Sequence, residues 1–163
     1  MNRLIVFHGG TEIVEHPLSK YGRPYLDFGQ GFYVTPLHEQ AVNWATQTAT
    51  RRKSSPILNK YHLNREAVIL EAHCKIFSAY DKEWLEFIVA NRKGTLTTDL
   101  YDYVEGGVAN DRVIDTINLF MAGLMDEDMA LRRLAEHQPN NQICMLSQKL
   151  IDKYLIFDGA ESL

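Results

Sequence analysis

A chain of 163 residues with 45% hydrophobic and 23% charged residues has the size of one globular domain with a sizeable core, so we expect a single domain over residues 1–163. Its 17 basic and 21 acidic residues give a formal charge of -4, which excludes a global electrostatic attraction to nucleic acid or to an anionic membrane. No run of about 18 apolar residues occurs, so no membrane-spanning helix is expected.

The first apolar run, Leu4 to Phe7, is closed by His8-Gly9-Gly10 and predicts a strand followed by a turn. This run is too short for the apolar region of a signal peptide. Cys74 and Cys144 both lie in apolar, strand-like runs, and we expect them to be buried thiols rather than a disulfide. These features together indicate a cytoplasmic protein.

A loop, a second strand and a helix are expected next. Pro17 to Pro24 carries turn residues and predicts the loop, and Gly31 to Thr35 predicts the strand. Pro36 suits the first turn of the helix. One face of this helix carries four residues at helical spacing: Ala41, Trp44, Ala45 and Thr48. The basic run at residues 51–53 ends the helix, where cations interact favourably with its dipole.

The middle of the chain predicts a strand, a helix and another strand. Ala67 to Cys74 reads as a central strand, and Tyr80 to Arg92 as a helix. Tyr101 to Val104 alternates as a strand that ends at Gly106-Gly107. We therefore expect three elements between residues 67 and 107.

Two helices and two strands complete the expected fold. Their ranges are Asp111 to about Gly123, Asp126 to His137, Gln142 to Leu146 and Tyr154 to Phe157. Pro139 ends the second of these helices. Short strands interleaved with helices, without strict alternation, favour an α+β domain over a doubly wound parallel sheet. The sequence holds no Gly-x-Gly-x-x-Gly motif between strand and helix, no phosphate loop and no paired zinc ligands, so no metal is expected.

Three segments place polar or aromatic residues on predicted strands. The first is Phe7-His8-Gly9-Gly10, the second is Phe28 to Thr35 with its Gly-x-Gly-Phe-Tyr sequence, and the third is Asn141-Gln142-Ile143. Trp44, on the helix after the second strand, follows Tyr33 by eleven positions.

In this order the three segments resemble the signature strands of the ADP-ribosyltransferases, in particular the diphtheria toxin and poly(ADP-ribose) polymerase branch, whose His, Tyr and Glu hold NAD. In the polymerase branch a second aromatic also falls eleven positions after the strand Tyr. The third segment departs from the pattern, because Gln142 stands where the polymerases have Glu. Further short matches are similar to a bacterial domain-of-unknown-function family of the same clan: Gly22-Arg23, Asp27-Phe28-Gly29, Gln40-Ala41, Asn91-Arg92, Val108 to Asp111 and Asn141 to Cys144.

The resemblance implies a split, twisted β-sheet core with flanking helices, and a catalytic triad of His8, Tyr33 and Gln142. His8 would hydrogen-bond the adenosine ribose, and Tyr33 would stack on the nicotinamide ring. Gln142 would hydrogen-bond the 2′-hydroxyl of the nicotinamide ribose, although an amide brings no charge to the cationic transition state and cannot serve as a base.

The same resemblance implies three further contacts to NAD. The backbone of Gly9 would bind the nicotinamide carboxamide, because glycine lets a ligand approach the chain closely. Trp44 would close the other face of the ring. Arg23 is a candidate for the pyrophosphate, since guanidinium pairs bidentately with phosphate.

The implied activity is mono-ADP-ribosylation, with NAD as a substrate and nicotinamide as a product. The acceptor stays open between protein, nucleic acid and a small molecule. An NAD glycohydrolase, in which water takes the acceptor role, is the alternative among enzymes. Gln142 also favours a catalytically silent module that binds NAD or ADP-ribose. By analogy with small cytoplasmic members of such families, a toxin neutralised by a partner protein is a further expectation.

Each of these residues also has an ordinary structural explanation. His8 could be a turn residue, Tyr33 and Trp44 could be core aromatics, and Gln142 could be a plain strand residue. Three more polar residues could face the cleft or the acceptor: Asp27, Asn110 and Asp111. Asn110 and Asp111 could equally cap helices. What favours the functional interpretation is the joint order of the three segments.

Overall fold

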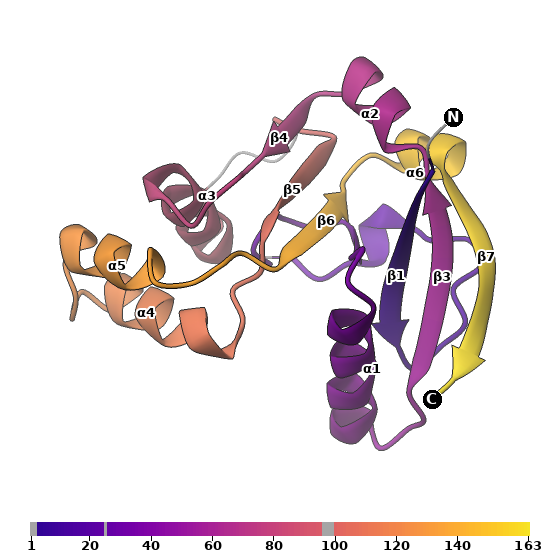
Figure 1. The fold of residues 1–163 in the computed structure, drawn as a ribbon, viewed down its shortest axis with the longest axis horizontal. Coiled ribbons are helices and arrows are strands. Elements are labelled where there is room, and N and C mark those ends of the chain that lie inside the picture. The colour runs from indigo at the N-terminus through magenta and orange to yellow at the C-terminus, as the bar shows by residue number, and fades with distance from the viewer. Residues whose placement is uncertain (1–2, 25, 96–99) are drawn as a thin grey trace.

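The computed structural model describes residues 3–24, 26–95 and 100–163, and its architecture is a mixture of helices and sheets (Figure 1). The strands within these ranges are β1 (Leu4–Gly10), β2 (Phe32–Val34), β3 (Ile57–Leu63), β4 (Cys74–Ile76), β5 (Tyr103–Gly107), β6 (Asn141–Met145) and β7 (Leu155–Ser162). The helices are the short 3-10 helix η1 (Ser19–Tyr21), then α1 (His38–Arg52), α2 (Arg65–Glu71), α3 (Lys82–Lys93), α4 (Asp111–Met121), α5 (Glu127–Leu134) and α6 (Gln148–Tyr154).

The described strands form two open sheets, one with the order β1-β3-β7 and one with the order β2-β6-β5-β4. The α+β class predicted from the sequence is confirmed. β1 and Thr35, the residue after β2, connect the two sheets through a single described bridge, in which Phe7 and Thr35 exchange backbone hydrogen bonds of 2.8 and 2.9 Å. Beyond this bridge β1 pairs with β3 and β2 pairs with β6, so the two strands diverge.

Both faces of the four-stranded sheet are buried. One face packs on the three-stranded sheet, where Phe32 and Val34 join a cluster with Val6 and Tyr61. The opposite face packs on α3, α4 and α5 in a cluster that includes Trp84 and other apolar residues (Figure 1). Because side chains alternate between the faces of a strand, Tyr33 lies on the helix-covered face, between Phe32 and Val34 in sequence.

The prediction of a central strand over Ala67 to Cys74 is wrong. Most of this run is helix α2, and only Cys74 begins a strand, β4. The Asn64 side chain accepts a hydrogen bond from the Ala67 N–H and caps the helix, which commits the following residues to helical geometry. Leu70 is 89% exposed, so the apolar run does not report a buried strand.

Besides α2 and most of β4, the sequence did not predict β3 and α6. β3 is the centre of the three-stranded sheet, and Asn59, Lys60 and His62 interrupt its apolar residues, which hides the strand pattern. η1 likewise lies within the predicted loop at Pro17 to Pro24. These differences add elements without changing the fold class.

Other expectations agree with the structure. The predicted helices near residues 38–52, 82–93 and 127–134 form, and Asp81 and Asp126 cap the last two through their side chains. Cys74 and Cys144 are free thiols, with Cys144 buried and Cys74 partly buried. The side chain of Asp111 lies outside the described part of the structure, so its expected capping role stays a prediction. None of the helices in the described ranges is long and apolar enough to cross a membrane.

Candidate functional site

A cavity of about 650 Å³ lies beside the divergence of β1 and β2, and we call it the central cavity. All six site residues predicted from the sequence line it: His8, Gly9, Arg23, Tyr33, Trp44 and Gln142. They come from β1, the loop after η1, β2, α1 and β6. The fold therefore brings together residues separated by more than a hundred positions in the chain.

His8 joins the two diverging strands through its ring. Its Nδ1 lies 2.8 Å from the Tyr33 carbonyl oxygen, and its ring stacks on Phe32 with centroids 4.5 Å apart. A carbonyl only accepts hydrogen bonds, so Nδ1 carries the proton and Nε2 keeps a lone pair in the neutral ring. Burial lowers the pKa of His8 below its ordinary 6.5, which favours this neutral form. Nε2 can thus accept a hydrogen bond from a ligand hydroxyl.

Gly9 offers free backbone groups on the same strand. Successive N–H and C=O pairs of a strand point to opposite edges, so those of Gly9 point to the same edge as those of Phe7. At Phe7 this edge pairs with Thr35, but in the described structure the pairing of β1 with β2 does not extend to Gly9. Gly9 lines the central cavity, and its backbone groups are therefore placed to bind a ligand amide.

The need for glycine at position 9 has a different cause from the one expected. A Cβ there would lie 1.9 Å from the carbonyl oxygen of Ala41 and 2.8 Å from the nitrogen of Ala45. Helix α1 thus packs directly on the backbone of β1, and the three alanines at positions 41, 45 and 49 are its buried residues. Glycine is required at position 9 because α1 packs on β1 there. The direction of the Gly9 backbone groups toward the cavity follows from the strand geometry.

Tyr33 is held by its hydroxyl group. The hydroxyl donates to the Gly29 carbonyl at 2.6 Å and lies 3.1 Å from the Phe28 N–H, which donates to it. Burial, more than nearby negative charge, raises the pKa of this hydroxyl well above 10.0, so Tyr33 is no general base at neutral pH. Its cross-strand neighbour Cys144 is also inert, because burial raises the pKa of that thiol to about 12. Tyr33 can offer a ring face of fixed position.

Trp44 lies next to the packed face of α1 rather than in the core. The alanine row buries the helix on β1, while Trp44 and Thr48 are partly exposed and line the central cavity. The predicted apolar face of this helix therefore consists of two rows. The alanines form the row that packs on β1, and Trp44 and Thr48 form the row that lines the cavity, which we call the cavity row. Arg51 and Arg52 continue the cavity row at helical spacing from Trp44, and the sequence interpretation had assigned them only to the helix dipole.

Gln142 is the least explained polar residue of the core. It is only 4% exposed, yet its amide makes no hydrogen bond with any described residue. Among the described side chains, no polar atom that is fully sealed from solvent lacks a partner. The Gln142 amide must therefore keep its access to solvent through the cavity that it lines. The amide is therefore open to a ligand that enters this cavity, and a ligand hydroxyl could replace its contact with water.

Arginine gathers around the central cavity of an acidic chain. Arg23, Arg51, Arg52 and Arg92 line it, against two carboxylates, Glu12 and Asp27. Asp27 is paired with Arg92 at 2.7 Å, so the remaining guanidinium groups outnumber the remaining carboxylate. The local field of the cavity favours an anionic ligand even though the chain carries a formal charge of -4.

Three amide side chains hold the loops that frame the central cavity, and sequence reasoning missed their role. Asn59, fully buried on β3, accepts from the Val14 N–H at 2.8 Å and donates to the Glu12 carbonyl at 3.0 Å. Asn91 donates to the Asp27 carbonyl at 2.9 Å, and Gln148 binds the backbone of residues 17 and 19. Only the Asn91-Arg92 pair gave a signal in the sequence, as part of the family pattern.

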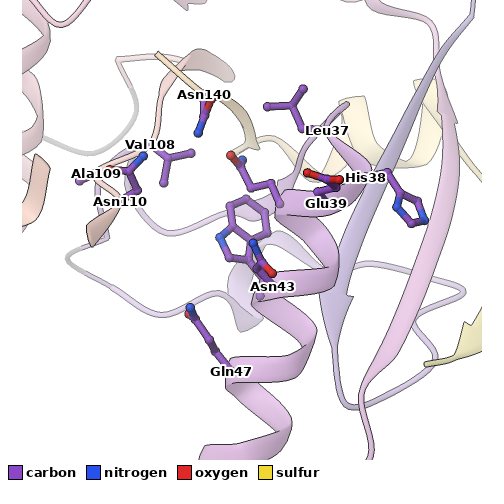
Figure 2. A pocket seen from close by; sticks show the side chains of 11 residues that line it. Leu37, His38, Glu39, Asn43, Gln47, Val108, Ala109, Asn110 and Asn140 are labelled. Carbon is purple, nitrogen blue, oxygen red and sulfur yellow. The ribbon is translucent and has the colours of Figure 1, made fainter. Parts of the chain in front are cut away.

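A second hollow of about 720 Å³ adjoins the central cavity, and we call it the amide-lined groove (Figure 2). Trp44, Gln47 and Val108 line both. Figure 2 shows Asn43 and Gln47 on α1 across from Val108 and Asn110. Asn110, which sequence reasoning offered as a cleft residue, thus lines the groove, whereas Asp27 lines the central cavity.

Fold and site together define an α+β domain whose two sheets share one bridge beside an arginine-rimmed cavity. The chain belongs to the family described as protein of unknown function (DUF3990), whose model matches residues 4–157. No curated protein and no solved structure matches the chain. The expectation of a domain-of-unknown-function family is therefore confirmed, and the family description assigns no activity.

Proposed function

We propose that this chain is an NAD-dependent mono-ADP-ribosyltransferase, with an ADP-ribosyltransferase-like split sheet that binds NAD in the central cavity. The observation that carries the proposal is the Gln142 amide, which is 4% exposed and has no partner among the described residues. A ribose hydroxyl would satisfy this amide. The other predicted contacts surround the same space.

Each part of NAD has a matching group around the cavity. The free backbone edge of Gly9 suits the nicotinamide carboxamide, and the rings of Tyr33 and Trp44 suit the flat nicotinamide. The lone pair on Nε2 of His8 suits a ribose hydroxyl. The guanidinium groups, among them Arg23, suit the pyrophosphate.

The chemistry follows from this placement. The bond between nicotinamide and C1′ of the ribose breaks, nicotinamide leaves with the electron pair, and the sugar becomes cationic. Gln142 holds the adjacent 2′-hydroxyl but adds no negative charge, so other groups must stabilise the cation, and positioning of the substrate contributes to the rate enhancement. His8 acts by orientation, because a ribose hydroxyl of the adenosine is remote from the breaking bond.

A catalytically silent module that binds NAD or ADP-ribose is the second candidate, and the neutral amide at position 142 favours it. Nicotinamide release from labelled NAD, with and without cell lysate, separates the candidates. Transfer of label to a macromolecule supports the transferase, and release without transfer supports an NAD glycohydrolase. Binding by calorimetry without either reaction supports the silent module, and absence of binding contradicts all three.

A further inference from the structure

We propose that the amide-lined groove is the acceptor site, and that it takes a basic side chain of a protein, with the guanidinium of arginine as the best fit. This inference rests on the proposed function of the central cavity. It concerns the groove between α1 and the segments at residues 108–110 and 140, where Asn110 was already a candidate to face the acceptor.

The position of the groove fits an acceptor site. Trp44, Gln47 and Val108 form the boundary between groove and central cavity, so a side chain entering the groove reaches the site where the sugar cation would form. Asn140 lines the groove two positions before Gln142 on the segment that leads into β6. The two hollows therefore meet beside the proposed ribose site.

The charges of the two hollows are opposite. Four arginines line the central cavity, but no described side chain lining the groove carries a permanent positive charge. Glu39 supplies the one carboxylate among those described lining residues, and five amides accompany it: Gln40, Asn43, Gln47, Asn110 and Asn140. Phosphate groups of a nucleic acid would find no lysine or arginine among the described lining residues, whereas a basic side chain would find a carboxylate and amide oxygens.

Guanidinium fits better than a phosphate or an apolar group for two reasons. It presents five donors in one plane, and carboxylate and amide oxygens accept such donors. It also stacks on aromatic rings, and Trp44 lies at the boundary of the groove. Gln40 is already tied to the Thr35 hydroxyl and the Asn141 carbonyl. Among the described lining residues of α1, Glu39, Asn43 and Gln47 are the other side chains with an oxygen acceptor.

The transfer step balances without a further reactant. The acceptor nitrogen forms a bond to C1′ as the bond from C1′ to nicotinamide breaks, and neutral nicotinamide leaves with the electron pair. The attacking nitrogen releases one proton to solvent. No oxidation or reduction takes place.

The test compares wild type with Glu39→Gln and with Glu66→Gln as the matched control. Glu39 and Glu66 are both exposed and both lie in the first turn of a helix, so each change removes one negative charge from an equivalent position. Each protein is incubated with labelled NAD and one of three unlabelled acceptors. These are an arginine-containing peptide, the same peptide with glutamine in place of arginine, and an oligonucleotide.

We expect transfer to the arginine peptide alone. Glu39→Gln should lower kcat/KM for this peptide roughly fivefold through KM, as for loss of one partly exposed ion pair, and leave NAD affinity and nicotinamide release into water unchanged. Glu66→Gln should behave as wild type. Equal transfer by Glu39→Gln and wild type, equal labelling of the arginine-free peptide, or labelling of the oligonucleotide would overturn the inference.

A binding experiment keeps this result separate from the proposed function. Tryptophan fluorescence during titration with acetyl-arginine amide reports the groove through Trp44, because Trp84, the other tryptophan, is fully buried. Wild type should respond at lower ligand concentration than Glu39→Gln. If NAD binding fails while this response holds, the proposed function falls and the basic-group site stands. If NAD is cleaved and the response is absent or equal in the two proteins, only the acceptor inference falls.

Discussion

The imidazole of His8 and the backbone carbonyl of Tyr33 are 2.8 Å apart, and this hydrogen bond spans the line along which β1 and β2 separate. Two residues that are neighbours in the proposed site thus also hold the strands that carry them. Any change at His8 therefore acts on both the shape of the cavity and its chemistry.

His8 gives a pH dependence with a defined sign. Its folded pKa is lowered below 6.5, so the unfolded chain binds a proton at higher pH than the folded chain does. Its contribution to the free energy of unfolding is complete above about pH 6.5 and is lost as the pH falls toward the lowered pKa. Urea unfolding of wild type and His8→Gln between about pH 5 and pH 8 checks this. An unchanged pH dependence in the variant would contradict the assignment.

The role of His8 in activity needs its own measurement. We expect His8→Gln to keep part of the nicotinamide release, because an amide can still hydrogen-bond a ribose hydroxyl. If the wild-type rate instead follows one pKa that disappears in His8→Gln, His8 is an acid or a base and the orienting role is wrong.

Two substitutions at Tyr33 distinguish the role of its ring from the role of its hydroxyl group. Tyr33→Phe removes the hydrogen bonds to Gly29 and Phe28 and should lower the free energy of unfolding by about 1–3 kcal/mol, with NAD affinity largely kept. Tyr33→Ala should lose the affinity as well, because the stacking face is gone. Calorimetric titration with NAD and urea unfolding measure the two effects. Equal NAD affinity in Tyr33→Ala and wild type refutes the stacking role.

Substitutions at Gln142 test its role as the third residue of the proposed triad. Gln142→Ala should lower the rate of nicotinamide release. Gln142→Glu should keep or raise this rate, because a carboxylate near the developing cation can lower the activation barrier by up to about 3 kcal/mol. Asn141→Ala, in an exposed neighbour, is the matched control. If Gln142→Ala matches wild type with and without acceptor, Gln142 is only a strand residue.

A substitution at Gly9 tests the close contact between β1 and α1. Gly9→Ala places a methyl group 1.9 Å from the Ala41 carbonyl oxygen, so α1 must move and the protein should lose about 1–3 kcal/mol or more of stability. Gly10→Ala is the control, because its Cβ would come no closer than 3.5 Å to a neighbour, the His8 ring. Thermal unfolding of both variants checks the prediction. Equal melting temperatures would show that α1 accommodates the methyl group.

Because arginines line the central cavity, we expect the affinity for NAD to fall as the salt concentration rises. Arg51→Gln should weaken NAD binding and make it less dependent on ionic strength, because a guanidinium group near the proposed pyrophosphate is lost. Arg132→Gln on α5 makes the same charge change at a residue that lines neither hollow. Calorimetry at low and high salt compares the two variants. Equal effects of both would indicate a general charge effect and contradict a local contact.

Elements with strong local signals could be predicted from the sequence. Asp81 and Asp126 cap helices through bonds to residues three positions on, and α1 buries alanines at helical spacing. The same local logic failed for α2, because an apolar run of residues 67–70 fits a strand or a helix equally well until the Asn64 cap is seen. It also failed for β3, whose polar residues are satisfied only by distant partners.

The order of the three segments, the neutral amide at position 142 and the acidic balance of the chain are properties of the sequence by itself. The tertiary structure alone decided that Gly9 packs on Ala41, that Asn59 holds the loop at Val14, and that Arg51 faces the cavity. Each of these depends on contacts between residues that are far apart in the chain, and burial and pairing are set by those contacts rather than by local periodicity. The Gln142 amide is the clearest case: its residue type is written in the sequence, but its burial without a partner among the described residues arises only when β6 lies beside β2 and β5.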